Sequence, residues 1–245
     1  MMNTQNKTWQ IFHFGLLVTG RTEEKHLPKL FSALQNQPEV QGHCHFEVIR
    51  FVNQLRPKKK KQSLNIIGKS KLIPDKATHI GFAARKYINK SEDHYVLLID
   101  DLEYEWKEQA FDVFQRYREI FDVILKAKKN RVAVHFLVYM LEAYYFADAN
   151  AINSVLSIHL KNYEGDVETI RHPKGELKRL FKGFDEIQHG GRILSRLDVE
   201  HVLSDKENCA SLRTLYQWCW KKIGQIPTNK YQLLNGKLNE VTRSQ

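Results

Sequence analysis

The sequence predicts an α/β fold in which a mostly parallel sheet of about four strands is flanked by helices. Short apolar runs rich in β-branched and aromatic residues alternate with amphipathic segments over the first 150 residues, as expected for successive βαβ units. Beyond residue 150 the strand signals fade and helical segments follow one another. We therefore expect an α/β domain over residues 1–150 and a helical C-terminal extension over residues 151–245, packed on that domain.

The first strand is predicted at Ile11–Val18, where the run IFHFGLLV is strongly apolar. It leads into the turn TGRTEE, after which leucines and a phenylalanine recur at helical spacing. Thr22 is the expected N-cap of this helix, and Glu23 then lies in the first turn, where the helix dipole favours negative charge. On this interpretation alone, Glu23 is a structural residue.

A second strand is predicted over His43–Val52, and a strongly basic segment follows it. Residues 56–76 hold eight basic residues against one acid, so they carry seven of the chain's ten net positive charges. The run at the start of this segment is Lys58, Lys59, Lys60 and Lys61. Such runs are often solvated linkers or internal counter-charges, but this one also suits the phosphate backbone of a nucleic acid. We expect it to bind DNA or RNA without sequence preference.

The central strand is predicted at Tyr95–Ile99, and four carboxylates follow it within six residues. These are Asp100, Asp101, Glu103 and Glu105. In open α/β sheets, ligand sites form at the carboxyl ends of strands, and carboxylates this close raise one another's pKa unless a cation neutralises them. Mg²⁺ or Mn²⁺, which prefers oxygen ligands, fits this pattern. The alternative is that Asp100 caps a helix and the other acids are solvated.

Helices are predicted over Ile80–Ile88 and Trp106–Lys128, and a fourth strand over Val132–Tyr139. The strand continues into MLEAYYFAD, so that Glu142 is an acid in an apolar stretch. A carboxylate in such surroundings is paired with an Arg or Lys, protonated, or bound to a metal. Further helical segments are predicted near residues 151–161, 175–184, 198–204 and 209–223, with turns at 171–174 and 190–192.

Composition and charge favour a protein that binds an anionic partner, and they argue against a membrane or zinc-binding protein. The net charge of +10 favours an anionic partner, most simply a nucleic acid. No apolar run approaches the ~18 residues that a membrane span needs, and the polar start has no signal-peptide pattern. Cys44, Cys209 and Cys219 are scattered and lack the spacing of a zinc site. We expect a cytoplasmic protein that has no disulfide framework and does not enter a membrane.

Three short motifs, taken in their order and spacing, resemble the Toprim domain of topoisomerases, primases and overcoming-lysogenization-defect nucleases. They are LVTGRTE at 17–23, LIDDLE at 98–103 and MLEAY at 140–144. With HPK at 172–174 and GRILSRLD at 191–198, they most resemble an uncharacterised bacterial Toprim-like domain-of-unknown-function family. The resemblance spans nearly the whole chain, and it implies a Toprim-like sheet.

The resemblance also implies a function: a nuclease of a bacterial phage-defence type system, dependent on Mg²⁺ or Mn²⁺ and acting with an ATPase encoded nearby. The implied metal ligands are Glu23, Asp101 and Glu103, with Asp100 as an alternative register. The implied catalytic residues are Glu23, Asp101, Glu103 and Glu142. Arg21 and Lys25 are placed to neutralise the substrate phosphate. The motifs leave open the choice between DNA and RNA and the oligomeric state.

One position departs from the family pattern. Thr19 stands where the first glutamate of the motif is expected. Threonine offers a hydroxyl group but no charge and no useful pKa. A second hypothesis is therefore a non-catalytic Toprim scaffold that binds nucleic acid or a partner ATPase.

Overall fold

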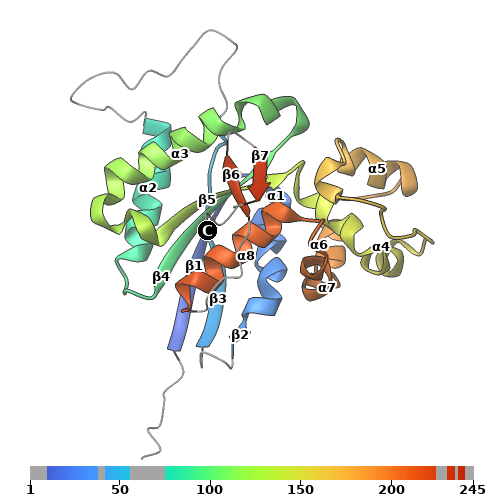
Figure 1. Ribbon diagram of the computed structural model, residues 1–245, viewed down its shortest axis with the longest axis horizontal. Coiled ribbons are helices and arrows are strands. Elements are labelled where there is room, and N and C mark those ends of the chain that lie inside the picture. The colour runs from blue at the N-terminus through green and yellow to red at the C-terminus, as the bar shows by residue number, and fades with distance from the viewer. Residues whose placement is uncertain (1–9, 38–41, 56–74, 225–230, 235–236, 241–245) are drawn as a thin grey trace, which may run out of the picture.

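The computed structural model describes residues 10–37, 42–55, 75–224, 231–234 and 237–240 of the chain. Its central sheet has four parallel strands and a short antiparallel edge strand (Figure 1). The strand order is β2 (Asn36–Gln37), β3 (Gly42–Phe51), β1 (Gln10–Val18), β4 (His94–Leu102) and β5 (Val132–Val138). The predicted fold class, an α/β protein with a mostly parallel sheet flanked by helices, is confirmed.

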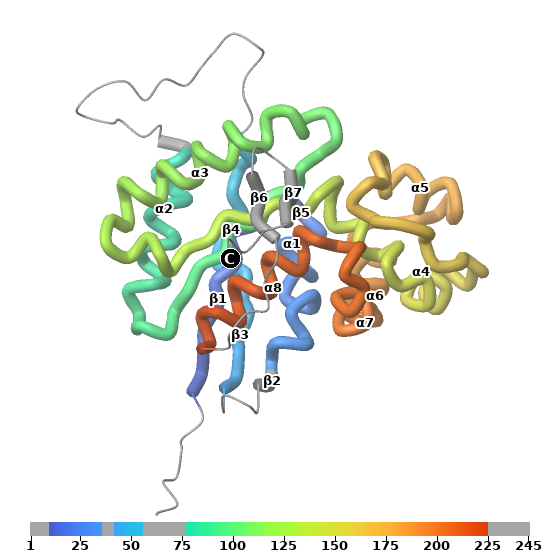
Figure 2. The backbone as a smooth tube through the Cα atoms, in the orientation of Figure 1, coloured from blue at the N-terminus to red at the C-terminus, as the bar shows by residue number. Residues whose placement is uncertain are grey.

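Helices cover both faces of the sheet. On one face, α2 (Asp75–Ile88) and α3 (Ala110–Leu125) share a core with alternate residues of the strands. On the other face lie α1 (Arg21–His26), the 3₁₀ helix η1 (Leu27–Leu34) and α8 (Ala210–Lys222). Figure 2 shows α8 crossing the strands from the C-terminal part of the chain. Because both faces are covered there, β1, β4 and β5 are largely apolar, whereas the first half of β3 alternates between buried and exposed residues.

The C-terminal part is mostly helical, and apart from α8 most of its helices lie beside the sheet in Figure 2. The remaining helices are η3 (Tyr104–Gln109), η4 (Lys126–Arg131), η5 (Leu141–Ala147), α4 (Ala149–Leu156), η6 (Val167–Thr169), α5 (Pro173–Leu180), α6 (Gln188–Leu194) and α7 (Val199–Ser204). One apolar core joins this part to the sheet. In this core the Phe31 ring stacks on the Phe46 ring, with the ring centroids 4.2 Å apart. The Tyr216 hydroxyl of α8 donates a hydrogen bond to the Leu30 carbonyl. The C-terminal helices therefore pack on the α/β part through this shared core.

Two local predictions about helices were wrong. The N-cap of α1 is Gly20, which makes no side-chain capping bond, and Thr22 is buried within the helix. The predicted helix Trp106–Lys128 is divided into η3, α3 and η4, with Lys126 at a φ of 51° at the C-terminal end of α3. A positive φ ends a regular helix, so α3 stops at Leu125 although the helix was predicted to continue to Lys128.

Two predictions about the C-terminal part were also wrong. The turn expected at 190–192 lies inside α6, because Gly190 and Gly191 allow that helix to approach Tyr145 and His26 closely. Packing against neighbours here overrides the turn preference of glycine. No strand was expected after residue 150, yet β6 (Tyr231–Leu234) and β7 (Lys237–Glu240) pair as an antiparallel hairpin. Among the described residues, no helix has the length and apolar character needed to cross a membrane.

Candidate active site

The two aspartates at the end of β4 point to opposite faces of the sheet. Side chains alternate along a strand, and Leu98 belongs to the core under α2 and α3 while Ile99 belongs to the other core. The strand continues beyond its predicted end, since Asp100 pairs with Phe136 and Asp101 with Leu137. Asp100 therefore lies on the α3 side, and Asp101 lies on the α1 side.

Asp100 is buried and held by three side-chain donors. The Thr19 hydroxyl and the Gln54 amide donate to Oδ1 at 2.7 and 2.8 Å, and the Tyr117 hydroxyl donates to Oδ2 at 2.9 Å. These donors come from the end of β1, the loop after β3 and helix α3. The arrangement indicates that Asp100 ties the sheet to α3, whereas the sequence predicted it as a metal ligand.

Three other carboxylates gather on the opposite face, and we call them the acid cluster: Glu23, Asp101 and Glu142. They follow β1, end β4 and follow β5, three adjacent parallel strands. Glu23 is 4% exposed and Glu142 is 2% exposed. Asp101 is partly exposed as a residue, but its Oδ1 is shielded from solvent and has no hydrogen-bond partner among the described residues. The structure thus brings together three of the four predicted catalytic acids.

Burial and mutual repulsion make these carboxyl groups weak acids. Burial, and then the neighbouring charges of Glu142 and Asp100, raise the pKa of Glu23 to about 7. Burial and the charges of Glu23 and Glu142 raise the pKa of Asp101 well above its usual range. Burial also raises the pKa of Glu142, although Lys174 opposes the shift. A cation placed among these groups would relieve the repulsion and lower all three pKa values.

Gly20 sets the position of the Glu23 carboxylate. A Cβ atom at Gly20 would lie 1.7 Å from Glu23 Oε2, so the carboxylate occupies the space that any other residue's side chain would need. The backbone does not require glycine, because the φ of Gly20 is −107°. Glycine is therefore needed here for space beside the acid cluster.

Lys174, at the start of α5, is the cation beside the cluster. Its Nζ lies 3.9 Å from Glu142 Oε1 and 2.9 Å from Glu186 Oε2. Burial alone would lower the pKa of Lys174, but the charges of Glu142 and Glu186 raise it above its usual value. Lys174 is therefore protonated and offsets part of the negative charge. The sequence had suggested an Arg or Lys partner for Glu142 but could not say which one.

Tyr145 contributes a polar atom to the same region. Its hydroxyl is buried and has no hydrogen-bond partner among the residues that the structure describes. The carboxylates of Glu142, Glu23 and Asp101 are near enough to help burial raise its pKa well above the usual range. A buried hydroxyl usually finds a partner, so its position beside the cluster is consistent with a ligand-binding region.

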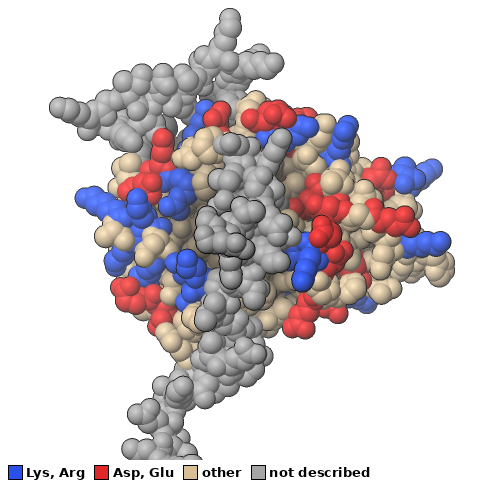
Figure 3. Space-filling model, viewed as in Figure 1, with Lys and Arg blue, Asp and Glu red and all other residues tan. Residues whose placement is uncertain are grey.

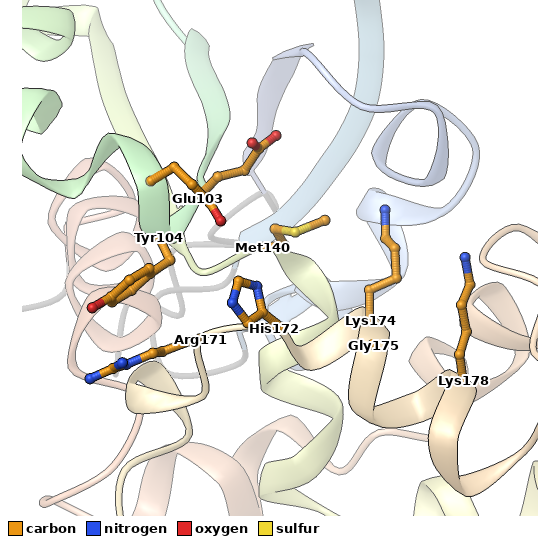
Figure 4. A pocket seen from close by; sticks show the side chains of 9 residues that line it. Glu103, Tyr104, Met140, Arg171, His172, Lys174, Gly175 and Lys178 are labelled. Atoms are coloured by element: carbon orange, nitrogen blue, oxygen red, sulfur yellow. The ribbon is translucent and has the colours of Figure 1, made fainter.

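A pocket of about 380 Å³ adjoins the cluster through Lys174 (Figure 4). We call it the α5 pocket. Its lining residues are Glu103, Tyr104, Glu105, Met140, Arg171, His172, Lys174, Gly175 and Lys178. The predicted ligand Glu103 thus faces this pocket, beside the acid cluster. Arg171 stacks on the Tyr104 ring, with its guanidinium carbon 4.7 Å from the ring centroid.

The residues predicted to bind phosphate are placed less favourably for that role than Lys174 is. Arg21 is 72% exposed and forms an ion pair with Glu24 at 2.8 Å, and Lys25 is exposed on α1. The run from Lys58 to Lys61 lies outside the described residues. On the face seen in Figure 3, acidic and basic side chains of the described residues are interspersed. Lys174, Glu186 and Tyr145 were not predicted as site residues, and only the HPK motif pointed to one of them.

One comparison with known protein families gave a match. Residues 18–218, well over half of the chain, match the family described as Domain of unknown function (DUF4276). The chain belongs to this family. The DUF4276 match includes all three residues of the acid cluster and Lys174, but its description names no activity. Neither the curated proteins nor the solved structures gave a match, and the Toprim relationship stays a prediction.

Proposed function

We propose that this DUF4276 protein is a nuclease that hydrolyses phosphodiester bonds with the help of Mg²⁺ or Mn²⁺. The observation that carries the proposal is the acid cluster, in which three carboxylates at the carboxyl ends of three adjacent strands crowd together with raised pKa values. The unpartnered Oδ1 of Asp101 gives this region an acceptor that no described residue satisfies. Such a donor set fits a hard divalent cation.

The cation would be held by one or two of Glu23, Asp101 and Glu142, with Glu103 at the edge of the neighbouring pocket. As arranged, the described His, Cys, Asp and Glu residues include no group of three that could hold a metal ion together. One or two carboxylates, with the substrate phosphate completing the shell, are a common way for proteins to bind Mg²⁺. When bound, the cation would polarise a phosphodiester oxygen and stabilise the leaving oxygen.

The chain's own residues have roles that do not depend on the cation. Gly20 leaves the space that orients the Glu23 carboxylate. Lys174 keeps its proton next to Glu142 and offers positive charge to an incoming phosphate. Asp100 fixes the end of β4 through its three hydrogen bonds, so that Asp101 is held on the α1 side.

The substrate that we propose is DNA or RNA. The support is the net charge of +10, most of it in residues 56–76. The resemblance adds a partner ATPase, a role in phage defence and a cytoplasmic location, all of which stay predictions. Neutralising Lys58 to Lys61 together should lower the slope of log affinity against log salt by roughly three to four units.

A second candidate function is a non-catalytic scaffold that binds nucleic acid or an ATPase. One observation favours it: the Thr19 hydroxyl, at the position of the family's first glutamate, donates its hydrogen bond to Asp100. Thr19 thus supports the fold and adds no charge to the acid cluster. If the site has lost its activity through this change, Thr19→Glu should restore measurable cleavage of DNA or RNA, provided that circular dichroism shows an intact fold.

The decisive experiment compares metal-dependent cleavage of nucleic acids by the wild-type protein and by the variant Asp101→Asn. The purified protein is incubated with single- and double-stranded DNA and RNA in Mg²⁺, Mn²⁺ or EDTA. We expect cleavage only with the metal, and a loss of at least about 100-fold in Asp101→Asn, as when one stabilising group is removed from an active site. Asp122→Asn is the matched control, because Asp122 is an exposed aspartate on α3. Equal cleavage by Asp101→Asn and wild type would refute the assignment, and no cleavage of any substrate would favour the scaffold.

A further inference from the structure

The α5 pocket has walls of opposite charge. Glu103 and Glu105 approach it from the segment after β4, and Lys174 and Lys178 approach it from α5. Arg171 adds a third positive charge to the lining, and its guanidinium group is held against the Tyr104 ring. Figure 4 shows the two lysine side chains extending in the same direction, with Met140 and His172 between them and the segment after β4. One wall is thus suited to a cation and the other to an anion.

The basic wall is connected to the acid cluster. Lys174 and Lys178 lie one helical turn apart, so their side chains share a face of α5. Both contact Glu186, at 2.9 and 3.2 Å, and Lys174 also lies 3.9 Å from Glu142. An anion bound at this wall would therefore lie next to Glu142, one of the carboxylates that would hold the cation under the proposed function.

Neither a cation nor an anion alone matches this pocket. A phosphate alone would face Glu103 and Glu105, and a divalent cation alone would face Lys174 and Lys178. A phosphate paired with a cation matches both walls, because the cation meets the carboxylates and the phosphate oxygens meet the lysines. Charge complementarity thus favours a paired ligand over either of its parts.

Resting on the proposed function, we propose that the α5 pocket binds the phosphate group of one nucleotide unit together with a divalent cation, so that the two bind cooperatively. The volume of about 380 Å³ falls within the range of small-molecule sites, about 300–1,000 Å³. That volume suits one nucleotide. The phosphate is either a terminal monoester or an internal diester of a strand.

Mn²⁺ binding provides a test that does not require turnover. Free and bound Mn²⁺ are distinguished by electron paramagnetic resonance, with the protein alone and with inorganic phosphate or adenosine 5′-monophosphate, after subtracting Mn²⁺ bound by the nucleotide in solution. We expect adenosine monophosphate to tighten Mn²⁺ binding by about 10-fold or more, and Mn²⁺ to tighten nucleotide binding by the same factor. Equal Mn²⁺ affinity with and without the phosphate ligands would overturn the proposal.

Two variants test whether the α5 pocket is responsible. A Cβ atom at Gly175 would meet only the His172 Cβ, at 3.7 Å, so Gly175→Met adds a side chain at the pocket without a backbone clash or a change in charge. Lys178→Met removes one phosphate-binding charge. Each should reduce the coupling to about 2-fold or less. Lys182→Met, which removes an exposed charge outside the pocket lining, is the matched control and should keep the wild-type coupling.

Dinucleotides distinguish the two sources of phosphate. If the pocket takes a terminal phosphate, a 5′-phosphorylated dinucleotide should tighten Mn²⁺ binding and its unphosphorylated form should not. If it takes an internal diester, both should do so. Coupling that disappears in Gly175→Met while no cleavage is found would support the pocket and refute the nuclease. Cleavage that persists unchanged in Gly175→Met would support the nuclease and refute the pocket.

Discussion

The acid cluster and Glu168 are two regions in which the protein buries carboxylates, and they differ in the hydrogen-bond partners of the carboxylate oxygens. Glu168, in η6, accepts hydrogen bonds from the Tyr144 hydroxyl at 2.9 Å and from the Ser211 backbone N–H at 2.9 Å. The Leu212 N–H also points to it, at 3.4 Å. Its donors thus come from within the fold, at the start of α8. In the acid cluster, Asp101 Oδ1 has no such partner among the described residues.

The two regions nevertheless share the same electrostatic signature. Burial, followed by the charge of Asp166, raises the pKa of Glu168 to about 7, although its hydrogen bonds oppose the rise. Burial and its carboxylate neighbours raise the pKa of Glu23 to about 7 as well. A raised pKa therefore does not distinguish a structural carboxylate from a functional one. The distinguishing features are the satisfaction of the oxygens and the neighbouring pocket.

The largest expected effect is on the pH dependence of stability. Because Glu23 and Glu168 have pKa values of about 7 in the folded protein and ordinary values of 4.5, the folded state binds more protons between these pH values. Stability is therefore greatest below pH 4.5 as far as these groups are concerned, and it is lost as pH rises toward 7, by about 3 kcal/mol for each group.

Urea unfolding at several pH values measures this effect. Mg²⁺ or Mn²⁺ should recover the part that belongs to the acid cluster, since the cation neutralises it, and should leave the part that belongs to Glu168. Glu23→Gln should remove the first part and Glu168→Gln the second. A metal-induced recovery that is the same in Glu23→Gln and in wild type would show that the cation acts elsewhere.

Removing one acid from each region should change stability in opposite directions. Glu168→Ala leaves the buried donors of Tyr144 and Ser211 without their acceptor, which should cost about 2–3 kcal/mol at pH 4.5, where the folded Glu168 is protonated and carries no buried charge. Asp101→Asn removes a charge from a repulsive cluster and should stabilise the protein by about 1 kcal/mol at pH 8. Chemical denaturation at these two pH values without metal measures both. Destabilisation by Asp101→Asn as large as that by Glu168→Ala would mean that the cluster is a structural network.

The contrast between Asp100 and Asp101 shows how much of the site the sequence could predict. The strands and their order of appearance follow from short apolar runs, and the structure confirms the fold class. The period of two along a strand requires adjacent aspartates to face opposite sides, but a strand that ends at Ile99, as the sequence predicts, leaves both aspartates in the following loop. Once β4 continues to Leu102, the separation of the two acids is determined.

Other parts of the site could not be predicted from local patterns. Lys174 meets Glu142 because α5 packs against η5, and no periodicity encodes that contact. Glu168 lies outside every motif. Its partners Ser211 and Leu212 come close to it only when α8 packs on the sheet. The lysine run was identified from composition, and it lies outside the described residues. Long-range packing therefore determined what the sequence analysis missed.

Gly20→Ala should have a small effect on stability and a larger one on the acid cluster. The backbone of Gly20 accommodates alanine, but the new Cβ would overlap Glu23 Oε2. Since the end of a glutamate side chain can move, we expect a change of less than about 1 kcal/mol in the free energy of unfolding. The displaced carboxylate should weaken Mn²⁺ binding by about 10-fold.

Mn²⁺ titration and thermal unfolding of Gly20→Ala measure the two quantities. Gly183→Ala is a control for the loss of a glycine, since Gly183 lies outside the acid cluster and its nearest neighbour is the Phe181 ring. Unchanged Mn²⁺ affinity in a folded Gly20→Ala protein would argue against Glu23 as a ligand.

The smallest expected effect comes from two adjacent tyrosines that belong to the two regions. The Tyr144 hydroxyl donates to Glu168 and accepts from the Val138 N–H, at 2.9 and 3.1 Å, whereas the Tyr145 hydroxyl has no hydrogen-bond partner among the described residues. Tyr144→Phe should therefore cost about 1–2 kcal/mol, and Tyr145→Phe should change stability by less than about 0.5 kcal/mol, because an unsatisfied buried hydroxyl gains nothing from its position. Urea unfolding of the two variants, side by side, measures the difference.

If Tyr145→Phe were as costly as Tyr144→Phe, the Tyr145 hydroxyl would have a hydrogen-bond partner in solution, and the acid cluster would be satisfied by the fold in the way that Glu168 is. If it is neutral without metal but lowers Mn²⁺ or nucleotide binding, Tyr145 contacts the bound ligand.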